Sequence, residues 1–226
     1  MDTWYATHDG NIEVLFKAKP KTFGGQHFGS RLVFDGSQNL FMTYGDRGNR
    51  NDAQNLSTHA GTVLRFTADG TTHPDNPFVE TPGALPEIYS YGHRNAQGAV
   101  LHPKTRVLWT HEHGPQGGDE VNIIRRGANY GWPVITYGEE YGGGTVSNLS
   151  EKEGMEQPVV YWVPSIAPSG MTFYTGNKFP KWNGNLFVGA LRGAHLRRIT
   201  LENGKVMDQE ELLSNLDERI RDVRNG

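Results

Sequence analysis

The chain has 226 residues, a formal net charge of −3 from 22 basic and 25 acidic residues, and no cysteine. This length suits one all-β domain, the lack of a basic excess argues against nucleic-acid binding, and the lack of thiols excludes disulfides and a cysteine nucleophile. No apolar run reaches the length of a membrane span, and the sequence does not begin with the basic-then-apolar pattern of a signal peptide.

Short strands joined by glycine-rich turns dominate the sequence. The first hairpin signal consists of an apolar run at 31–34, an Asp-Gly turn and a second apolar run at 39–44. Related elements follow along the chain, at 61–66, at 98–101 with 107–110, at 170–174 with 185–189, and at 195–200. Long helical periodicity is scarce, and the best helical candidate is the acidic stretch 208–216.

Regular recurrence of these hairpins favours a β-propeller. The aromatic positions Phe41, Trp109 and Phe187 are separated by 68 and 78 residues, more than the about 40–50 residues of common propeller repeats. Long inserted loops account for the excess, and such loops are where sites usually lie. A β-sandwich remains an alternative at this level. Residues 219–223 alternate like the first strand of a pair without its return strand, so we expect one propeller domain over residues 1–226 that is incomplete.

Two loops carry candidate acid–base residues. His27 lies among small residues before the first hairpin, and histidine is the side chain best suited to general-base work near neutral pH. Asp46 follows the strand at 39–44 and could accept a hydrogen bond from a histidine. An exposed loop histidine and an ordinary turn aspartate are the alternatives.

A third segment, residues 91–98, places Arg94 and Asn95 side by side. In an extended strand they would face opposite ways, but at a strand end both can reach one ligand. Arginine offers a rigid fork of donors for carboxylate or quinone oxygens. The alternative is a capped turn with a surface salt bridge.

The segment 111–120 combines two histidines with a Gly-Pro pair and acidic residues. Zinc would need a third ligand that is not evident. A Gly-Pro kink at Gly114 and Pro115 exposes carbonyl oxygens, and Glu120 adds a carboxylate, which are ligands that Ca²⁺ accepts. A plain polar loop is equally compatible with the composition. The aromatic residues of 127–141 could wall a planar ligand, although core packing is the better interpretation for Trp132.

These segments, in this order, resemble the soluble quinoprotein sugar dehydrogenases, which depend on pyrroloquinoline quinone (PQQ), and within them the aldose sugar dehydrogenases. The resemblance is carried by the strings at 27–34, 91–95, 113–120, 129–133, 168–171 and 219–223. It implies a six-bladed propeller, of which this chain would hold about four blades, with the quinone over its top face.

The resemblance also implies roles for individual residues. His27 matches the catalytic base, Asp46 the carboxylate that orients it, and Arg94 with Asn95 the contacts to the quinone oxygens. Gly114 and Pro115 match carbonyl ligands of the calcium bound to the quinone, and Glu120 and Tyr130 match ligands of a second calcium. Further cofactor contacts are matched by Tyr141, Arg192, Gly193, Ala194, Arg219, Arg221, Asp222 and Val223.

The implied reaction is oxidation of the C1 hydroxyl of an aldose to the lactone, with hydride transfer to a calcium-bound quinone. The implied partners are the sugar and an external electron acceptor, in a periplasmic or secreted monomer or homodimer. Two other functions stay open: a metal-dependent, lactonase-like propeller hydrolase and a propeller that binds without catalysis.

Overall fold

The computed structural model describes residues 3–8, 11–37 and 39–226. Within these residues it contains three four-stranded antiparallel sheets, one two-stranded sheet and three short 3₁₀ turns, which confirms the all-β class. The chain divides into two compact units. The first comprises residues 1–95, 125–133 and 153–156, and the second comprises residues 96–124, 134–152 and 157–226.

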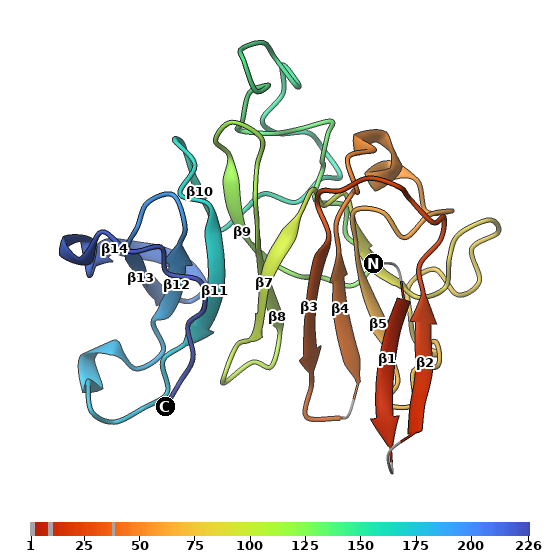
Figure 1. Ribbon diagram of the computed structural model, residues 1–226, viewed down its shortest axis with the longest axis horizontal. Helices are drawn as coiled ribbons and strands as arrows, with labels where there is room; N and C mark the ends of the chain where they lie inside the picture. Colours follow the sequence, from red (N-terminus) through yellow and green to blue (C-terminus); the bar gives the residue numbers. More distant parts are fainter. Residues whose placement is uncertain (1–2, 9–10, 38) are drawn as a thin grey trace. The chain divides into compact units, whose positions relative to one another are not determined.

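The first unit contains a hairpin and one four-stranded sheet (Figure 1). Strands β1 (Thr3–His8) and β2 (Asn11–Lys17) form the hairpin. The sheet has the order β3 (Gly29–Phe34), β4 (Leu40–Tyr44), β5 (Thr62–Phe66) and β6 (Ile88–Tyr91). Phe16 of the hairpin packs against Phe66 with ring centroids 4.9 Å apart, so the hairpin extends the core of this sheet. A 3₁₀ turn, η1 (Arg50–Gln54), lies between β4 and β5.

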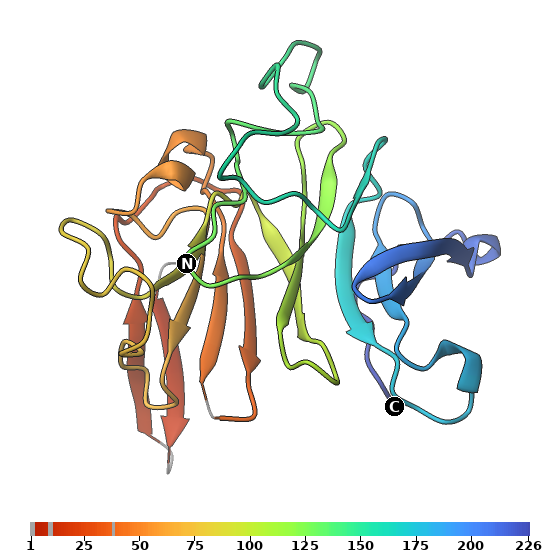
Figure 2. The same cartoon turned by 180° about the vertical axis from the view of Figure 1, so that it is seen from behind.

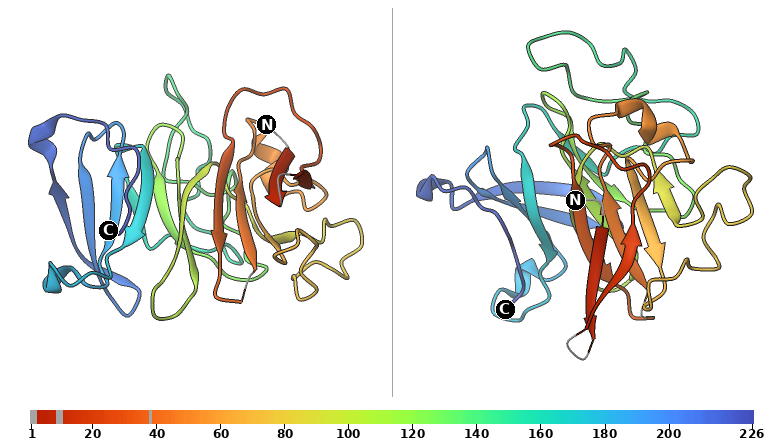
Figure 3. Two further views of the ribbon diagram at one scale, coloured as in Figure 1. Left: turned by 60° about the horizontal axis from the view of Figure 1, so that its bottom comes forward. Right: turned by 45° about the vertical axis from the view of Figure 1, so that its right-hand side comes forward.

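The second unit contains two four-stranded sheets. One has the order β7 (Ala96–Leu101), β8 (Leu108–Glu112), β9 (Asp119–Ile123) and β10 (Val160–Trp162). The other has the order β11 (Pro168–Phe173), β12 (Leu186–Ala190), β13 (Leu196–Glu202) and β14 (Lys205–Leu212), the cyan-to-blue strands of Figure 3. The two sheets share a core around Trp109, Val121, Phe173 and Val188. The turns η2 (Pro180–Trp182) and η3 (Ser214–Leu216) complete the unit.

The hairpins expected from the sequence are confirmed, and they repeat a common plan. Strands β4, β8 and β12 each stand second in their sheet and are buried along their whole length. Each of the three begins with a short apolar run, such as Leu108 and Trp109 in β8, and these runs are the signals that marked the hairpins in the sequence. Phe41, Trp109 and Phe187 lie on these three strands, so the wide spacing measures whole sheets plus the loops inserted into them.

The expected helix at 208–216 is wrong. Residues 205–212 form strand β14, which pairs with β13 at the edge of its sheet (Figure 2). The turn between them has positive φ at Asn203 (50°) and Gly204 (76°), as a tight hairpin requires. The acidic side chains of β14 then face arginines across the strands, with Glu210 2.6 Å from Arg198. Cross-strand charge pairing outweighs the modest helix propensity of this stretch.

The strand expected at 219–223 is also wrong, because residues 217–226 form no regular element. The segment instead follows the start of β11, where the Gly170 N–H donates to the Arg221 carbonyl at 3.1 Å. No helix in the described ranges is long and apolar enough to cross a membrane.

Candidate active site

Strand ends and loops of the first unit bring four predicted residues together. The His27 Nδ1 lies 2.6 Å from Asp46 Oδ1, and the Asp46 N–H donates to the Arg94 carbonyl at 2.8 Å. The Asn95 Oδ1 accepts from the Gly29 N–H at 3.1 Å. His27, Asp46, Arg94 and Asn95 are therefore neighbours, although up to 68 positions separate them in the sequence.

Gly45 makes this close approach possible, because a Cβ at this position would collide with the His27 carbonyl and press on that of Arg94. His27 itself has a φ of 52°, a left-handed conformation that costs a non-glycine residue about 1–3 kcal/mol. Its side chain is 17% exposed, whereas that of Asp46 is 1% exposed. The histidine thus faces outward from a buried carboxylate.

Arg47 holds the loop that carries His27. Its buried guanidinium donates to the carbonyls of Gln26 and Gly24, both at 2.8 Å, and lies 3.8 Å from the centre of the Phe28 ring. These bonds hold the backbone that precedes the strained histidine, and the ring contact holds the side chain that follows it. No local pattern predicts this role, because an arginine in a glycine-rich turn looks like a surface residue.

Trp132 is a second residue that the sequence did not assign to the site. Its indole Nε1–H donates to Asp46 Oδ2 at 2.8 Å, and the Arg94 guanidinium lies 5.3 Å from the ring centre. Trp132 is 7% exposed, so the expectation of core packing was incomplete rather than wrong. Trp132 and Asp46 are 86 positions apart in the sequence, so no local pattern predicts their contact.

Two neighbours of these residues have structural contacts. His93 is fully buried, lies 3.0 Å from Ser90 Oγ and stacks on Tyr130 with centroids 4.5 Å apart. The Tyr130 hydroxyl accepts from the Arg125 N–H at 2.8 Å, and burial raises the Tyr130 pKa above its ordinary value. Tyr130, a predicted calcium ligand, therefore lies in the first unit with a phenol that is already hydrogen-bonded.

In the second unit, Asp119 organises the Gly114–Pro115 loop. Its fully buried carboxylate accepts from the Gly114 N–H at 3.0 Å through Oδ1. Its Oδ2 accepts from the Ser165 hydroxyl at 2.6 Å and from the Ile166 N–H at 2.9 Å. The loop packs so tightly that a Cβ at Gly114 would collide with the Gly117 and Gly118 carbonyls.

Glu120 lies in a cluster of polar side chains on β8 and β9. It faces Glu112 directly across the two strands, and Asn122 Nδ2 is 3.3 Å from an oxygen of each carboxylate. Burial, with the Glu112 charge as a second cause, raises the Glu120 pKa from 4.5 to about 8. Two buried oxygens beside the pair, Thr110 Oγ1 and Asn122 Oδ1, have no hydrogen-bond partner.

The remaining predicted cofactor residues lie at the surface of the second unit. Arg192 and Gly193 line a cavity of about 450 Å³ together with Tyr161, Ser165 and Arg197. Ala194 follows them, half-buried, with a φ of 49°. Tyr141 is 70% exposed in a separate glycine-rich loop. The other four lie in the segment beside β11, where Arg219, Arg221 and Asp222 are exposed and Val223 is half-buried.

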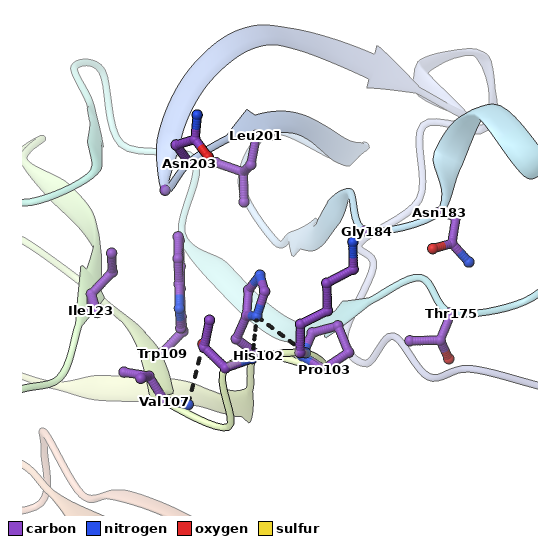
Figure 4. A pocket seen from close by; sticks show the side chains of 13 residues that line it. His102, Pro103, Val107, Trp109, Ile123, Thr175, Asn183, Gly184, Leu201 and Asn203 are labelled. Carbon is purple, nitrogen blue, oxygen red and sulfur yellow. Dashed lines mark hydrogen bonds between the residues drawn. The ribbon is translucent and has the colours of Figure 1, made fainter.

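A second cavity, of about 720 Å³, lies between the turns of the two sheets in the second unit (Figure 4). His102, Trp109 and Leu201 line it, and the His102 Nδ1 accepts from the turn N–H groups of Lys104 and Thr105. None of its lining residues is a predicted site residue. Among the residues described, no three His, Asp or Glu side chains form a metal-binding group.

Comparisons with known proteins were made for the whole sequence. Residues 5–226 match the family described as Glucose / Sorbosone dehydrogenase. The chain is 44% identical to the aldose sugar dehydrogenase YliI of Escherichia coli K12 over 96% of its own length and 59% of that protein. It thus spans about three fifths of this relative.

Solved structures agree with this match. A glucose dehydrogenase crystal structure is 47% identical, with a TM-score of 0.93 over 96% of this chain and 63% of that one. The PQQ-bound aldose sugar dehydrogenase of Streptomyces coelicolor is 33% identical, with a TM-score of 0.75 over 96% of this chain and 57% of that one. The expected partial β-propeller is confirmed.

Proposed function

Because this chain belongs to the glucose/sorbosone dehydrogenase family, we propose that the whole protein oxidises the C1 hydroxyl of aldose sugars to lactones, with hydride transfer to a calcium-bound PQQ. The observation that carries this proposal is the His27–Asp46 pair beside Arg94. An external acceptor takes the electrons away, and we assign the protein to the periplasm or the outside of the cell.

The donors on this chain suit a quinone that carries carboxylates. Arg94 and Asn95 are adjacent in the sequence and each is 6% exposed, and Arg192 lines a cavity of about 450 Å³. Exposed Arg219 and Arg221 add positive charge to the second unit. Guanidinium groups bind carboxylates and polarised oxygens well because their donors form a planar fork.

The oxygen ligands on this chain suit Ca²⁺. The Gly114–Pro115 loop is held by Asp119, and we assign its two carbonyls to the calcium next to the quinone. Glu120 lies beside Glu112 and the unpartnered Thr110 and Asn122 oxygens in a cluster rich in oxygen atoms. A hard cation with oxygen ligands satisfies such a cluster, and we assign the second calcium to Glu120.

His27 supplies the base of the reaction. A carboxylate only accepts hydrogen bonds, so the 2.6 Å contact with Asp46 places the proton on His27 Nδ1. The neutral ring then has its lone pair on Nε2, which takes the proton of the C1 hydroxyl. General-base catalysis of this kind contributes about 10²–10⁴-fold.

Arg94 supplies positive charge near the base. Arg94 is 6% exposed, and a preorganised charge in a site that excludes water stabilises negative charge better than it would in solvent. When bound, PQQ supplies a two-electron acceptor and Ca²⁺ supplies a Lewis acid on its quinone oxygen.

The test is dye reduction by aldoses after the whole protein is loaded with PQQ and Ca²⁺. We expect activity that His27→Ala reduces at least about 100-fold, while the matched His73→Ala, in a loop after β5, leaves it unchanged. Calorimetric binding of PQQ without any turnover would instead support the non-catalytic binding propeller. Lactone hydrolysis that depends on a metal and not on PQQ would support the hydrolase.

A further inference from the structure

Asp46 is a buried anion held by donors on both of its oxygens. Oδ1 accepts from His27 Nδ1 at 2.6 Å and from the Gly48 N–H at 2.8 Å. Oδ2 accepts from the Trp132 indole at 2.8 Å. The carboxylate is 1% exposed, so water does not replace a lost donor easily. In the described part of the chain, Trp132 is the side chain that fixes the Oδ2 end.

The geometry of a carboxylate links its two oxygens rigidly. Holding Oδ2 prevents rotation of the group about its Cβ–Cγ bond, and this keeps Oδ1 in line with His27 Nδ1. Removing one donor from a buried acceptor leaves that oxygen unsatisfied, which is unfavourable. The same loss leaves the imidazole free to turn, which misplaces its Nε2 relative to the substrate.

Trp132 is itself held by the segment that carries Arg94. Its N–H donates to the Gly92 carbonyl at 2.9 Å, and its carbonyl accepts from Gln54 Nε2 at 2.8 Å. The face of its ring lies 5.3 Å from the Arg94 guanidinium, within the range of a cation–π contact. One indole therefore touches both the carboxylate behind the base and the arginine.

We propose that Trp132 is a positioning residue that acts through Asp46 to orient His27 relative to Arg94. The catalytic consequence rests on the proposed function, but the Trp132–Asp46–His27 linkage does not. Trp132 makes the reacting geometry rigid and takes no part in proton transfer, because an indole N–H donates a hydrogen bond without giving up its proton.

The first experiment compares Trp132→Phe with Trp109→Phe in the PQQ- and Ca²⁺-loaded protein. Phenylalanine keeps an aromatic face for Arg94 and removes only the N–H and part of the ring. Trp109 is equally buried, at 3%, in the core of the second unit, and controls for lost packing. We expect Trp132→Phe to lower kcat about 10- to 30-fold with KM for the aldose within about twofold, and Trp109→Phe to change neither.

A double-mutant cycle tests whether Trp132 acts through Asp46. In the Asp46→Ala background we expect Trp132→Phe to change kcat by less than about twofold, because the linkage is already lost. An undiminished 10- to 30-fold loss in that background would overturn the proposal, as would equal losses for Trp132→Phe and Trp109→Phe.

A spectroscopic experiment needs neither activity nor a Trp132 variant. In the Asp46→Ala protein, we expect the NMR signal of the Trp132 Nε1–H to move upfield as its acceptor disappears. The Trp162 Nε1–H, which donates to Gln209 at 2.8 Å, serves as the internal control and should not move. A Trp132 signal that stays in place would overturn the linkage. If the signal moves but the loaded protein shows no turnover, the proposed function fails while the linkage stands.

Discussion

The two units treat their buried carboxylates in opposite ways. In the first unit, Asp46 receives three N–H donors from His27, Gly48 and Trp132. In the second, Glu112 and Glu120 face each other across β8 and β9 with the amide of Asn122 between them. Burial and mutual repulsion raise the Glu120 pKa to about 8, and two nearby oxygens have no partner.

The negative charge at Asp46 is stabilised by donors of the chain itself, whereas the carboxylates at Glu112 and Glu120 would be stabilised by a bound cation. Donors around Asp46 stabilise its negative charge and orient His27 without any bound group. Beside Glu120, the described residues place a second carboxylate and two unpartnered oxygens, and buried negative charge is costly unless positive charge is added. The first cluster thus orients His27 with its own donors, and the second is where we propose the second calcium.

Replacing Asp46 by asparagine is expected to give the largest effect. The amide keeps the shape of the side chain but offers a neutral group, so His27 loses both its preferred tautomer and the charge behind it. We expect kcat of the loaded protein to fall about 10³-fold, with the fold retained by circular dichroism. Asp75→Asn, on an exposed loop residue, is the control, and a kcat of Asp46→Asn within about threefold of wild type would show that the cluster does not direct the base.

Arg47→Ala is expected to give the next largest effect, this time on stability. It removes two hydrogen bonds from a charged guanidinium to the carbonyls of Gln26 and Gly24, in the loop before His27, and bonds of this charged kind contribute about 1.5–3 kcal/mol each. We expect the free energy of unfolding in urea to fall by about 2–3 kcal/mol. Arg224→Ala removes an exposed pair with Asp222 and should change it by less than about 0.5 kcal/mol. Equal effects of the two variants would contradict the role of Arg47 in holding the loop that carries His27.

Features of the fold could be predicted from the sequence where the residues that determine them are close together in the chain. The strands β4, β8 and β12 were predictable because each begins with a local apolar run. The stretch 208–216 was misread because its decisive partners, Arg197 and Arg198, lie on the neighbouring strand. Its acidic residues carry no local sign of that pairing.

The site shows the same limit. Four site residues could be predicted because they are polar side chains in short glycine-rich loops, namely His27, Asp46, Arg94 and Asn95. The fold brings these residues together. Trp132 and Arg47 could not be assigned, because their partners are set by loop geometry that only the folded chain defines. Asp119 stands inside a string that was singled out, yet its bonds to Ser165 and Ile166 are invisible in sequence.

Glu112→Gln is expected to raise the stability of the metal-free protein at pH 8, whereas Arg47→Ala lowers stability. The folded state holds a proton on Glu120 up to about pH 8, whereas an unfolded chain releases it near the ordinary value of 4.5. Stability is therefore full below about pH 4.5 and falls as the pH rises towards 8. Removing the Glu112 charge should recover about 1–2 kcal/mol at pH 8 and reduce the fall.

The same variant is also tested with added calcium. In the wild type we expect saturating Ca²⁺ to raise the melting temperature more at pH 8 than at pH 5, and we expect Glu112→Gln to weaken that response. Asp208→Asn, on the edge strand β14, controls for the loss of an acidic residue elsewhere. A variant less stable than wild type at pH 8 without calcium would contradict the idea that this pair is frustrated.

The smallest effect is expected for Glu210→Ala on β14. Glu210 is 44% exposed and pairs with Arg198 at 2.6 Å, so solvent screens the attraction and the long side chains lose entropy when they pair. Arg198 keeps its contacts with Asn185 and with the Trp182 ring, so no buried group loses its partner. We expect the free energy of unfolding to fall by less than about 0.5 kcal/mol and the difference to shrink in 1 M salt. A loss above about 1.5 kcal/mol would mean that strand pairing at this edge depends on the charges, and the contrast would then lie between paired and unpaired carboxylates rather than between buried and exposed ones.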